Sequence, residues 1–125
     1  MKPKKTILIV EDEPDIIKYI KEILTGKFDV ETATTGSQAL DKAKEFLPDI
    51  ILLDIMLRKI DGFEVCRRIK NDPNLENTKI IIQSAKAMQQ DKENGFEAGA
   101  DAYITKPFDH NTLLETIEDL LGSKD

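Results

Sequence analysis

The sequence has very little of several residue types on which whole classes of protein depend. Its 125 residues include one cysteine, one histidine and no tryptophan. Cys66 alone cannot form a disulfide within the chain, and His110 has no second histidine with which to build a zinc site. The longest aliphatic runs, residues 50–53 and 80–82, are far shorter than the ~20 residues of a bilayer span. No apolar signal region precedes residue 6, so we expect a cytoplasmic protein without membrane contact.

The charge balance is acidic. Acidic residues number 24 and basic residues 18, which gives a net charge of -6. Such a surface repels phosphate backbones, so we expect no direct nucleic acid binding by this segment. Hydrophobic residues make up 40% of the chain, which is too many for a disordered segment, and the length suits one domain spanning residues 1–125.

Short β-branched or aliphatic runs alternate with stretches of helical periodicity along the whole chain. The pattern predicts strands at residues 6–10, 29–33, 50–54, 79–83 and 102–105, and helices at residues 14–24, 37–46, 63–70, 89–98 and 110–121. Continuously apolar strands that alternate with helices favour a parallel sheet covered on both faces. The fold class is therefore α/β, with a doubly wound five-stranded sheet.

Polar residues follow four of the predicted strands. Glu11 and Asp12 follow the first strand, Asp54 ends the third, Ser84 follows the fourth and Lys106 follows the fifth. The carboxyl ends of parallel strands meet at one edge of the sheet, so these side chains should share one cleft. Three carboxylates at close range require a counter-cation, and oxygen ligands suit Mg²⁺, or Mn²⁺ in its place.

Asp54 is the candidate nucleophile of this cleft. It directly follows four aliphatic residues, where a charge needs a partner or a function. A carboxylate beside a divalent cation can attack phosphorus, because the metal neutralises both the attacking group and the phosphoryl oxygens. In this interpretation Glu11 and Asp12 hold the metal, while Lys106 and Ser84 stabilise the phosphoryl group.

These residues resemble the receiver domains of two-component response regulators, including the single-domain chemotaxis regulators. The resemblance runs from residue 6 to residue 121, which would be the core of a single receiver domain. It rests on the acidic segment after the first strand, the segment around Asp54, the Asp-Gly turn and the segments around Ser84 and the Lys-Pro pair, that is, on residues 7–13, 52–57, 61–64, 84–86 and 99–108. It implies a flavodoxin-like (βα)5 sandwich of three layers with strand order 2-1-3-4-5.

The resemblance also implies a function. A sensor histidine kinase or a histidine phosphotransfer protein would pass a phosphoryl group to Asp54 in a Mg²⁺-dependent reaction. Glu11, Asp12, Asp54 and the backbone carbonyl of Met56 would bind the metal. The domain would catalyse only its own phosphorylation and slow dephosphorylation, and it would signal by binding an unknown downstream protein.

The switch of the family carries over to two further positions. By this resemblance, the phosphoryl group would draw the Ser84 hydroxyl inward and Tyr103 would fill the space that is vacated. The surface of the fourth helix, fifth strand and fifth helix would change as a result. The resemblance further implies a cis peptide bond between Lys106 and Pro107, which X–Pro bonds tolerate at a cost of about 0.5–1 kcal/mol.

Several positions depart from the family pattern. Arg58 and Lys59 stand where a Pro-Gly pair is usual, so we expect a more flexible and more basic loop after Asp54. Met56 and Lys86 occupy positions that adjust the lifetime of the phosphoryl group. Thr116 stands where dimerising members carry a basic residue, which favours a monomer.

Other apolar residues allow both a functional and a purely structural interpretation. Ile17 should point outward one turn beyond the acidic cluster, and with Pro14 it is a candidate docking position for the kinase, although a lone exposed isoleucine often has no role. Cys66, Met88 and Phe96 are expected to be packing residues.

Competing functions are less consistent with the sequence. A Mg²⁺ phosphatase with an aspartyl-phosphate intermediate needs an aspartate two residues after the nucleophile, where Met56 stands. A nucleotide- or flavin-binding module needs a Gly- or hydroxyl-rich loop after the first strand, where this chain has acidic residues. A receiver-like fold used only for binding would not need Asp54 and Lys106. The sequence leaves open whether the chain is a stand-alone regulator or a receiver from a longer protein.

Overall fold

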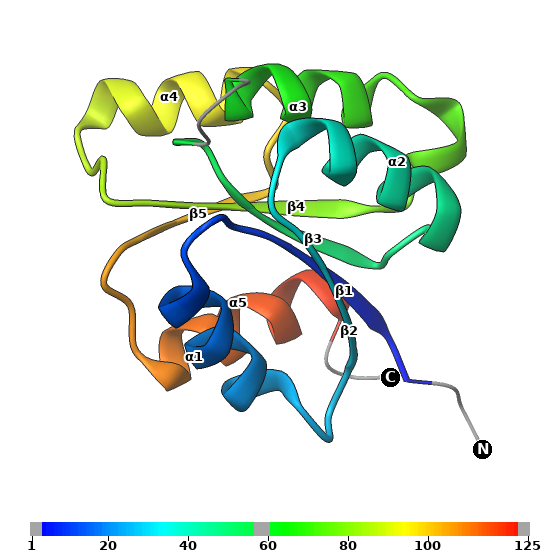
Figure 1. Cartoon of the computed structure of the whole chain (residues 1–125). Coiled ribbons are helices and arrows are strands. Elements are labelled where there is room, and N and C mark those ends of the chain that lie inside the picture. The colour runs from blue at the N-terminus through cyan, green and yellow to red at the C-terminus, as the bar shows by residue number, and fades with distance from the viewer. Residues whose placement is uncertain (1–3, 57–60, 123–125) are drawn as a thin grey trace.

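A five-stranded parallel sheet forms the middle layer of the protein. The computed structural model in Figure 1 describes residues 4–56 and 61–122. The strands lie in the order β2-β1-β3-β4-β5, which confirms the predicted topology. Their bounds are β1 (Thr6–Val10), β2 (Asp29–Ala33), β3 (Ile50–Asp54), β4 (Lys79–Ser84) and β5 (Ala102–Thr105).

Helices cover both faces of the sheet. Helices α1 (Pro14–Leu24) and α5 (His110–Leu121) lie on one face, and α2 (Gly36–Phe46), α3 (Gly62–Lys70) and α4 (Gln89–Glu97) lie on the other (Figure 1). A short 3-10 turn, η1 (Pro73–Leu75), lies in the long connection before β4. The result is the three-layer α/β sandwich that the alternating pattern predicted. In the part of the chain that the structure describes, no helix is both long and apolar enough to cross a membrane.

The alternation of side chains along each strand divides the core in two. In β3, Ile51 and Leu53 belong to the cluster under α2 and α3, whereas Ile50 and Leu52 belong to the cluster under α1 and α5. All four side chains are fully buried, because helices cover the strand on both sides. This parity also determines which side each residue at the end of a strand faces.

Local hydrogen bonds explain why some elements begin or end beside their predicted bounds. Helix α2 begins at Gly36 because the Thr35 side chain accepts a hydrogen bond from the Gln38 backbone. Helix α3 begins at Gly62 because Asp61 caps it in the same way. Strand β4 extends to Ser84, which pairs with β5.

Two expected packing residues are exposed. Met88 is 73% exposed and Phe96 is 50% exposed, so the prediction that they belong to the core was wrong. Met88 precedes α4 as its N-cap, and Gly95 is the only buried residue of α4, so the other side chains of this helix are half-buried or exposed. Cys66, by contrast, is buried in α3 as expected. Arg58 and Lys59 lie outside the described residues.

Candidate functional site

Glu11 is the most deeply buried charged residue at the carboxyl edge of the sheet. Its side chain is 0% exposed, and both carboxylate oxygens accept hydrogen bonds. Oε2 accepts from the backbone N–H groups of Asp12 and Glu13, each at 3.1 Å. Oε1 accepts from Lys106 Nζ at 2.8 Å and from Gln83 Nε2 at 3.1 Å. These donors fix the orientation of the carboxylate.

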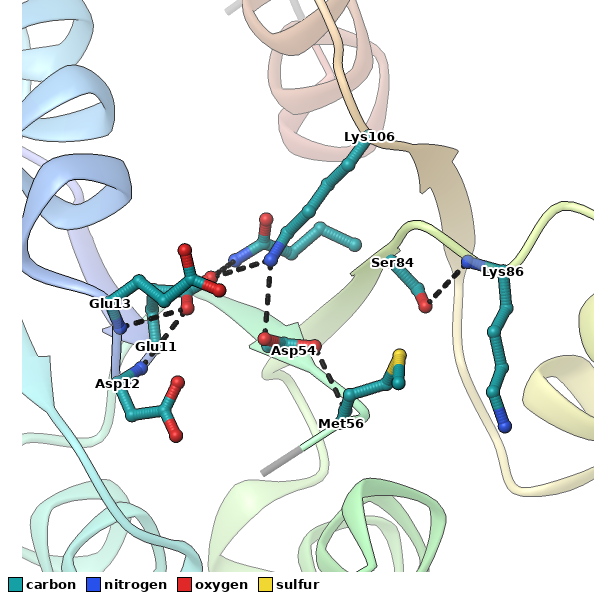
Figure 2. Close-up of polar contacts among 9 residues, drawn as sticks. Glu11, Asp12, Glu13, Asp54, Met56, Ser84, Lys86 and Lys106 are labelled. Carbon is teal, nitrogen blue, oxygen red and sulfur yellow. Dashed lines mark hydrogen bonds and ion pairs between the residues drawn. The ribbon is translucent and has the colours of Figure 1, made fainter. Parts of the chain in front are cut away.

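Asp54 lies at the centre of the site in Figure 2. It ends β3 with a side chain that is only 6% exposed. Oδ1 accepts a 2.9 Å hydrogen bond from the Met56 backbone N–H, and Oδ2 lies 3.2 Å from Lys106 Nζ. The backbone of β3 and these two donors therefore hold the Asp54 carboxylate in one direction.

Three carboxylates converge at this edge. Glu11, Asp12 and Asp54 each offer an oxygen, and these oxygens all lie within 4.8 Å of one another. Glu11 and Asp12 come from the loop after β1, and Asp54 comes from the neighbouring strand β3 (Figure 2). An acidic group of this kind could hold a metal ion, because like charges so close together favour a shared cation.

The ammonium of Lys106 partly balances these charges. Burial lowers its pKa, but the hydrogen bond with Glu11 and the charge of Asp54 outweigh burial, so the net pKa is raised. At Glu11 the balance is reversed, since burial raises the pKa and exceeds the lowering by Lys106. Lys106 therefore stays charged at neutral pH, and its ammonium partly offsets the effect of burial on the pKa of Glu11.

Strand parity explains why these residues meet. Asp54 follows Ile50 and Leu52 on the α1 and α5 side of β3, and Gln83 is the register partner of Asp54 on β4. Directly opposed residues on neighbouring parallel strands face the same side of the sheet. Lys106 follows the inward-facing Ile104 at the same spacing of two residues. The peptide bond between Lys106 and Pro107 is cis.

Sequence reasoning missed Gln83. It is fully buried, and its amide contacts Glu11 inside the site. The available signal was a polar residue that directly follows the isoleucines of β4, the same pattern that identified Asp54 in β3.

Ser84 and Tyr103 lie on the other side of the sheet from Gln83. The Ser84 side-chain oxygen accepts a 3.0 Å hydrogen bond from the Lys86 backbone (Figure 2). The Tyr103 hydroxyl donates a 2.7 Å hydrogen bond to the Lys86 carbonyl. Burial raises the pKa of Tyr103, and the neighbouring Ser84 side chain partly offsets this effect. The loop after β4 thus connects the two residues.

Two surface hollows flank α1 beside the acidic group. One, of ≈ 480 Å³, includes Asp12, Pro14 and Ile17 in its lining. The other, of ≈ 470 Å³, is lined by Ile16, Tyr19, Ala85, Lys106, Pro107 and Phe108. Ile17 is partly buried and Pro14 is exposed, so the two predicted docking positions border the same hollow as a member of the acidic group.

The family comparison gives one extended match. The sequence model of the response regulator receiver domain matches residues 7–118. The chain is 43% identical over 116 residues to the response regulator ArlR of Staphylococcus aureus, covering 92% of this chain and 52% of that protein. It is 38% identical over 120 residues to RpaA of Synechocystis, described as a DNA-binding dual master transcriptional regulator, covering 95% and 50%. The chain thus spans about half the length of these curated relatives.

Solved structures share the fold over nearly the whole chain. A putative response regulator from Chloroflexus aurantiacus has a TM-score of 0.90 at 32% identity, covering 95% of this chain and 98% of that one. The receiver domain of a sensor histidine kinase from Pseudomonas aeruginosa has a TM-score of 0.88 at 32% identity, covering 96% and 99%. The latter structure is described as having a magnesium ion coordinated in its active site cleft.

Proposed function

The chain belongs to the response regulator receiver family, and from this premise we propose that it is the phosphoacceptor of a two-component phosphorelay. Response regulators are signalling proteins rather than classical enzymes. The domain takes a phosphoryl group from a phosphohistidine donor onto Asp54 and transmits the signal by binding. One observation carries the proposal: a buried strand-end carboxylate, Asp54, lies beside the acidic pair Glu11 and Asp12 and 3.2 Å from the ammonium of Lys106.

Asp54 is the nucleophile. A carboxylate oxygen forms a bond to phosphorus, the bond between phosphorus and the donor imidazole breaks, and its electron pair leaves with the imidazole nitrogen. The hydrogen bond from the Met56 backbone to Oδ1 restricts rotation of the carboxylate, so little reorganisation is needed before attack. Because the domain catalyses this step only on itself, its own phosphorylation and slow dephosphorylation are its whole chemistry.

The acidic group fits a hard divalent cation, Mg²⁺ or Mn²⁺. Its carboxylates supply oxygen ligands within 4.8 Å of one another. Glu11, Asp12, Asp54 and the Met56 backbone carbonyl are the groups that would hold the ion. When bound, the ion neutralises the attacking carboxylate and the transferred phosphoryl oxygens.

Lys106 and Ser84 stabilise the phosphoryl group once it is on Asp54. Lys106 Nζ already lies 3.2 Å from Asp54 Oδ2, so a small movement brings it to a phosphoryl oxygen. Ser84 ends β4, the strand that neighbours β3 and Asp54. Its hydroxyl can donate a hydrogen bond to another phosphoryl oxygen.

The signal leaves through the surface of α4, β5 and α5. Tyr103 of β5 contacts the loop after Ser84 through its hydroxyl, and its ring lies next to Gly95 of α4. A change at Ser84 therefore reaches α4 through Tyr103. Met88 and Phe96 expose apolar surface at this helix, which suits a downstream protein partner.

The phosphodonor docks on α1. Pro14 and Ile17 line the hollow that also includes Asp12, so a helix of a sensor histidine kinase or a histidine phosphotransfer protein seated there would bring its phosphohistidine to the acidic group.

We further propose that residues 1–125 form one receiver domain with its core at residues 6–121. This domain acts as a monomer in the cytoplasm and does not itself contact nucleic acid, consistent with a net charge of -6.

Intact-mass spectrometry tests the acceptor chemistry. The protein is incubated with Mg²⁺ and acetyl phosphate, in parallel with Asp54→Asn and with a chelated sample. We expect the wild type to gain one phosphoryl group that hydroxylamine removes. Neither Asp54→Asn nor the chelated sample should gain it. Asp49→Asn is the matched control, because Asp49 lies at the opposite end of β3, where its side chain binds the Thr6 backbone. If the wild type stays unmodified with acetyl phosphate and also with a phosphohistidine donor, the phosphoacceptor role is contradicted. The domain would then act only by binding other proteins.

A further inference from the structure

Gln83 is a buried amide that directly follows the aliphatic run of β4. Three isoleucines precede it in β4, and its side chain is completely removed from solvent. Buried polar side chains are retained in a core where they bind another group, since an aliphatic residue would pack there at lower cost. The position of Gln83 therefore calls for an explanation beyond packing.

The contact that Gln83 makes is long-range and specific. Its register partner is Asp54 on β3, and Glu11 follows β1 on the far side of β3. The Gln83 side chain therefore extends across Asp54 and donates from Nε2 to Glu11 Oε1 at 3.1 Å. Two strand spacings amount to about 10 Å, which glutamine and glutamate span together and which a shorter asparagine would not.

The other end of the amide has no such contact. Gln83 Oε1 is buried and has no hydrogen-bond partner among the residues that the structure describes. Exchanging the amide oxygen and nitrogen would place an oxygen against the Glu11 carboxylate and lose the bond, so the orientation is determined by Glu11. Gln83 therefore keeps its hydrogen bond to Glu11 although its other polar atom has no partner among the described residues. This indicates that the bond to Glu11 explains why a glutamine stands at this position.

Among the described residues, Glu11 has one other side-chain donor at Oε1, and that donor also contacts Asp54. Lys106 binds Oε1 of Glu11 at 2.8 Å and also lies 3.2 Å from Asp54. If Asp54 accepts a phosphoryl group, the new oxygens compete with Glu11 for the same ammonium. Gln83 is uncharged and approaches from β4, so its bond to Glu11 does not depend on that competition.

Building on the proposed function, we propose that Gln83 is a positioning residue of the metal site. It holds the Glu11 carboxylate in the orientation that serves the cation, both before phosphorylation and after Lys106 turns to the phosphoryl group. Partners that orient a ligating carboxylate from behind typically change metal affinity by 10–100-fold when they are removed.

The test uses Gln83→Met, which keeps side-chain length and removes both the donor and the unsatisfied oxygen. Mg²⁺ affinity is measured by calorimetry, and folding stability by urea unfolding without metal. We expect Mg²⁺ to bind about 10-fold more weakly while stability is unchanged or higher. The Mg²⁺ concentration for half-maximal phosphorylation by acetyl phosphate should rise by the same factor. Thr78→Val is the control, because it removes another buried hydrogen bond, to Pro48, at the opposite edge of the sheet.

Equal Mg²⁺ affinity in wild type and Gln83→Met overturns the positioning role and leaves the proposed function intact. If the wild type binds no Mg²⁺, the proposed function fails, and the positioning role of Gln83, which rests on it, fails as well. If Gln83→Met does not fold, the side-chain amide signals of wild-type Gln83 are followed by NMR during a Mg²⁺ titration. They should shift more than those of the exposed Gln38 and Gln90, and signals that stay fixed at saturating Mg²⁺ overturn the inference.

Discussion

The Tyr103 hydroxyl donates a 2.7 Å hydrogen bond to the backbone carbonyl of Lys86, and this bond connects the centre of β5 to the loop after β4. The same loop is held from the other side, because the Lys86 N–H donates to the Ser84 side chain. One residue of the loop therefore connects the proposed phosphoryl ligand Ser84 with the proposed switch residue Tyr103.

We predict that Tyr103→Phe loosens this loop without unfolding the protein. The variant loses one partly exposed hydrogen bond, so the free energy of unfolding should fall by no more than about 1 kcal/mol. The ring remains in place, whereas Tyr103→Ala would also remove its packing against Gly95. Hydrogen exchange of the loop amides is the measurement. Protection in Tyr103→Phe equal to that of wild type would show that the bond does not order the loop.

Lys106→Met should slow phosphorylation strongly. Removal of the ammonium takes away the positive charge that lies 3.2 Å from Asp54 Oδ2 and leaves Glu11 buried with less compensation. Loss of one such stabilising group typically costs about 10²–10³-fold in rate. The rate of phosphoryl uptake is followed by intact mass. Lys106→Arg retains the charge and should recover part of the loss, while uptake by Lys106→Met at the wild-type rate would contradict the role given to Lys106.

Mg²⁺ should stabilise the folded protein through Asp12. A ligand at 100 times its dissociation constant adds about 2.7 kcal/mol to the free energy of unfolding. Asp12→Asn removes one of three carboxylates whose oxygens lie within 4.8 Å, so its Tm should rise in the absence of metal and respond little to Mg²⁺. Asp15→Asn, an exposed acid in the first turn of α1, is the control. Equal Mg²⁺ stabilisation of Asp12→Asn and wild type would place the cation elsewhere.

Much of the fold follows from the sequence for a physical reason. Continuous aliphatic runs such as residues 50–53 favour a sheet covered on both faces, and the helix predicted between consecutive strands supplies the crossover that parallel strands need. Polar residues that directly follow such runs must lie at one edge. For this reason the sequence alone placed Glu11, Asp12 and Asp54 together, and the structure brings their carboxylate oxygens within 4.8 Å.

The features that the sequence did not reveal depend on register and on helix rotation. Gln83 reaches Glu11 only because β4 pairs with β3 in a register that sets it opposite Asp54, and no local pattern encodes that register. Met88 and Phe96 are apolar, yet their exposure follows from how α4 is turned on the sheet. Hydrophobicity predicts that a residue tends to be buried, but not which side of a marginally amphipathic helix faces the core.

The thiol of Cys66 should make stability depend on alkaline pH. Burial raises its pKa from 9.0 to about 11. Because the thiol has a higher pKa in the folded protein than in the unfolded chain, the stability linked to the protonated thiol is fully present below a pH of about 9. It is lost as the pH rises through about 11. The loss should approach about 2–3 kcal/mol. The free energy of unfolding of wild type and of Cys66→Ala is measured in urea at each pH. The difference between the two proteins gives the part due to the Cys66 thiol, because the other titratable groups affect both proteins alike. Parallel stability curves would contradict the prediction.

Gly62, the first residue of α3, lies against the end of β3 that carries Asp54. A Cβ at this position would lie 2.2 Å from the backbone Cα of Ile55 and 3.0 Å from the carbonyl oxygen of Asp54. Backbone atoms cannot rotate away as side chains do, so Gly62→Ala must displace α3 or the end of β3. We expect a loss of about 2 kcal/mol or more in the free energy of unfolding, together with slower phosphorylation of Asp54.

Gly95→Ala is the matched control for Gly62→Ala, since the three atoms nearest to its added Cβ are side-chain atoms of Ile82 and Tyr103, at 3.0 Å or more. The alanine also gains up to about 1 kcal/mol of helix propensity in α4, which offsets part of the crowding. Urea unfolding and the rate of phosphoryl uptake measure both variants. If Gly62→Ala lost no more stability than Gly95→Ala, the close approach of α3 to the end of β3 would not constrain the position of Asp54.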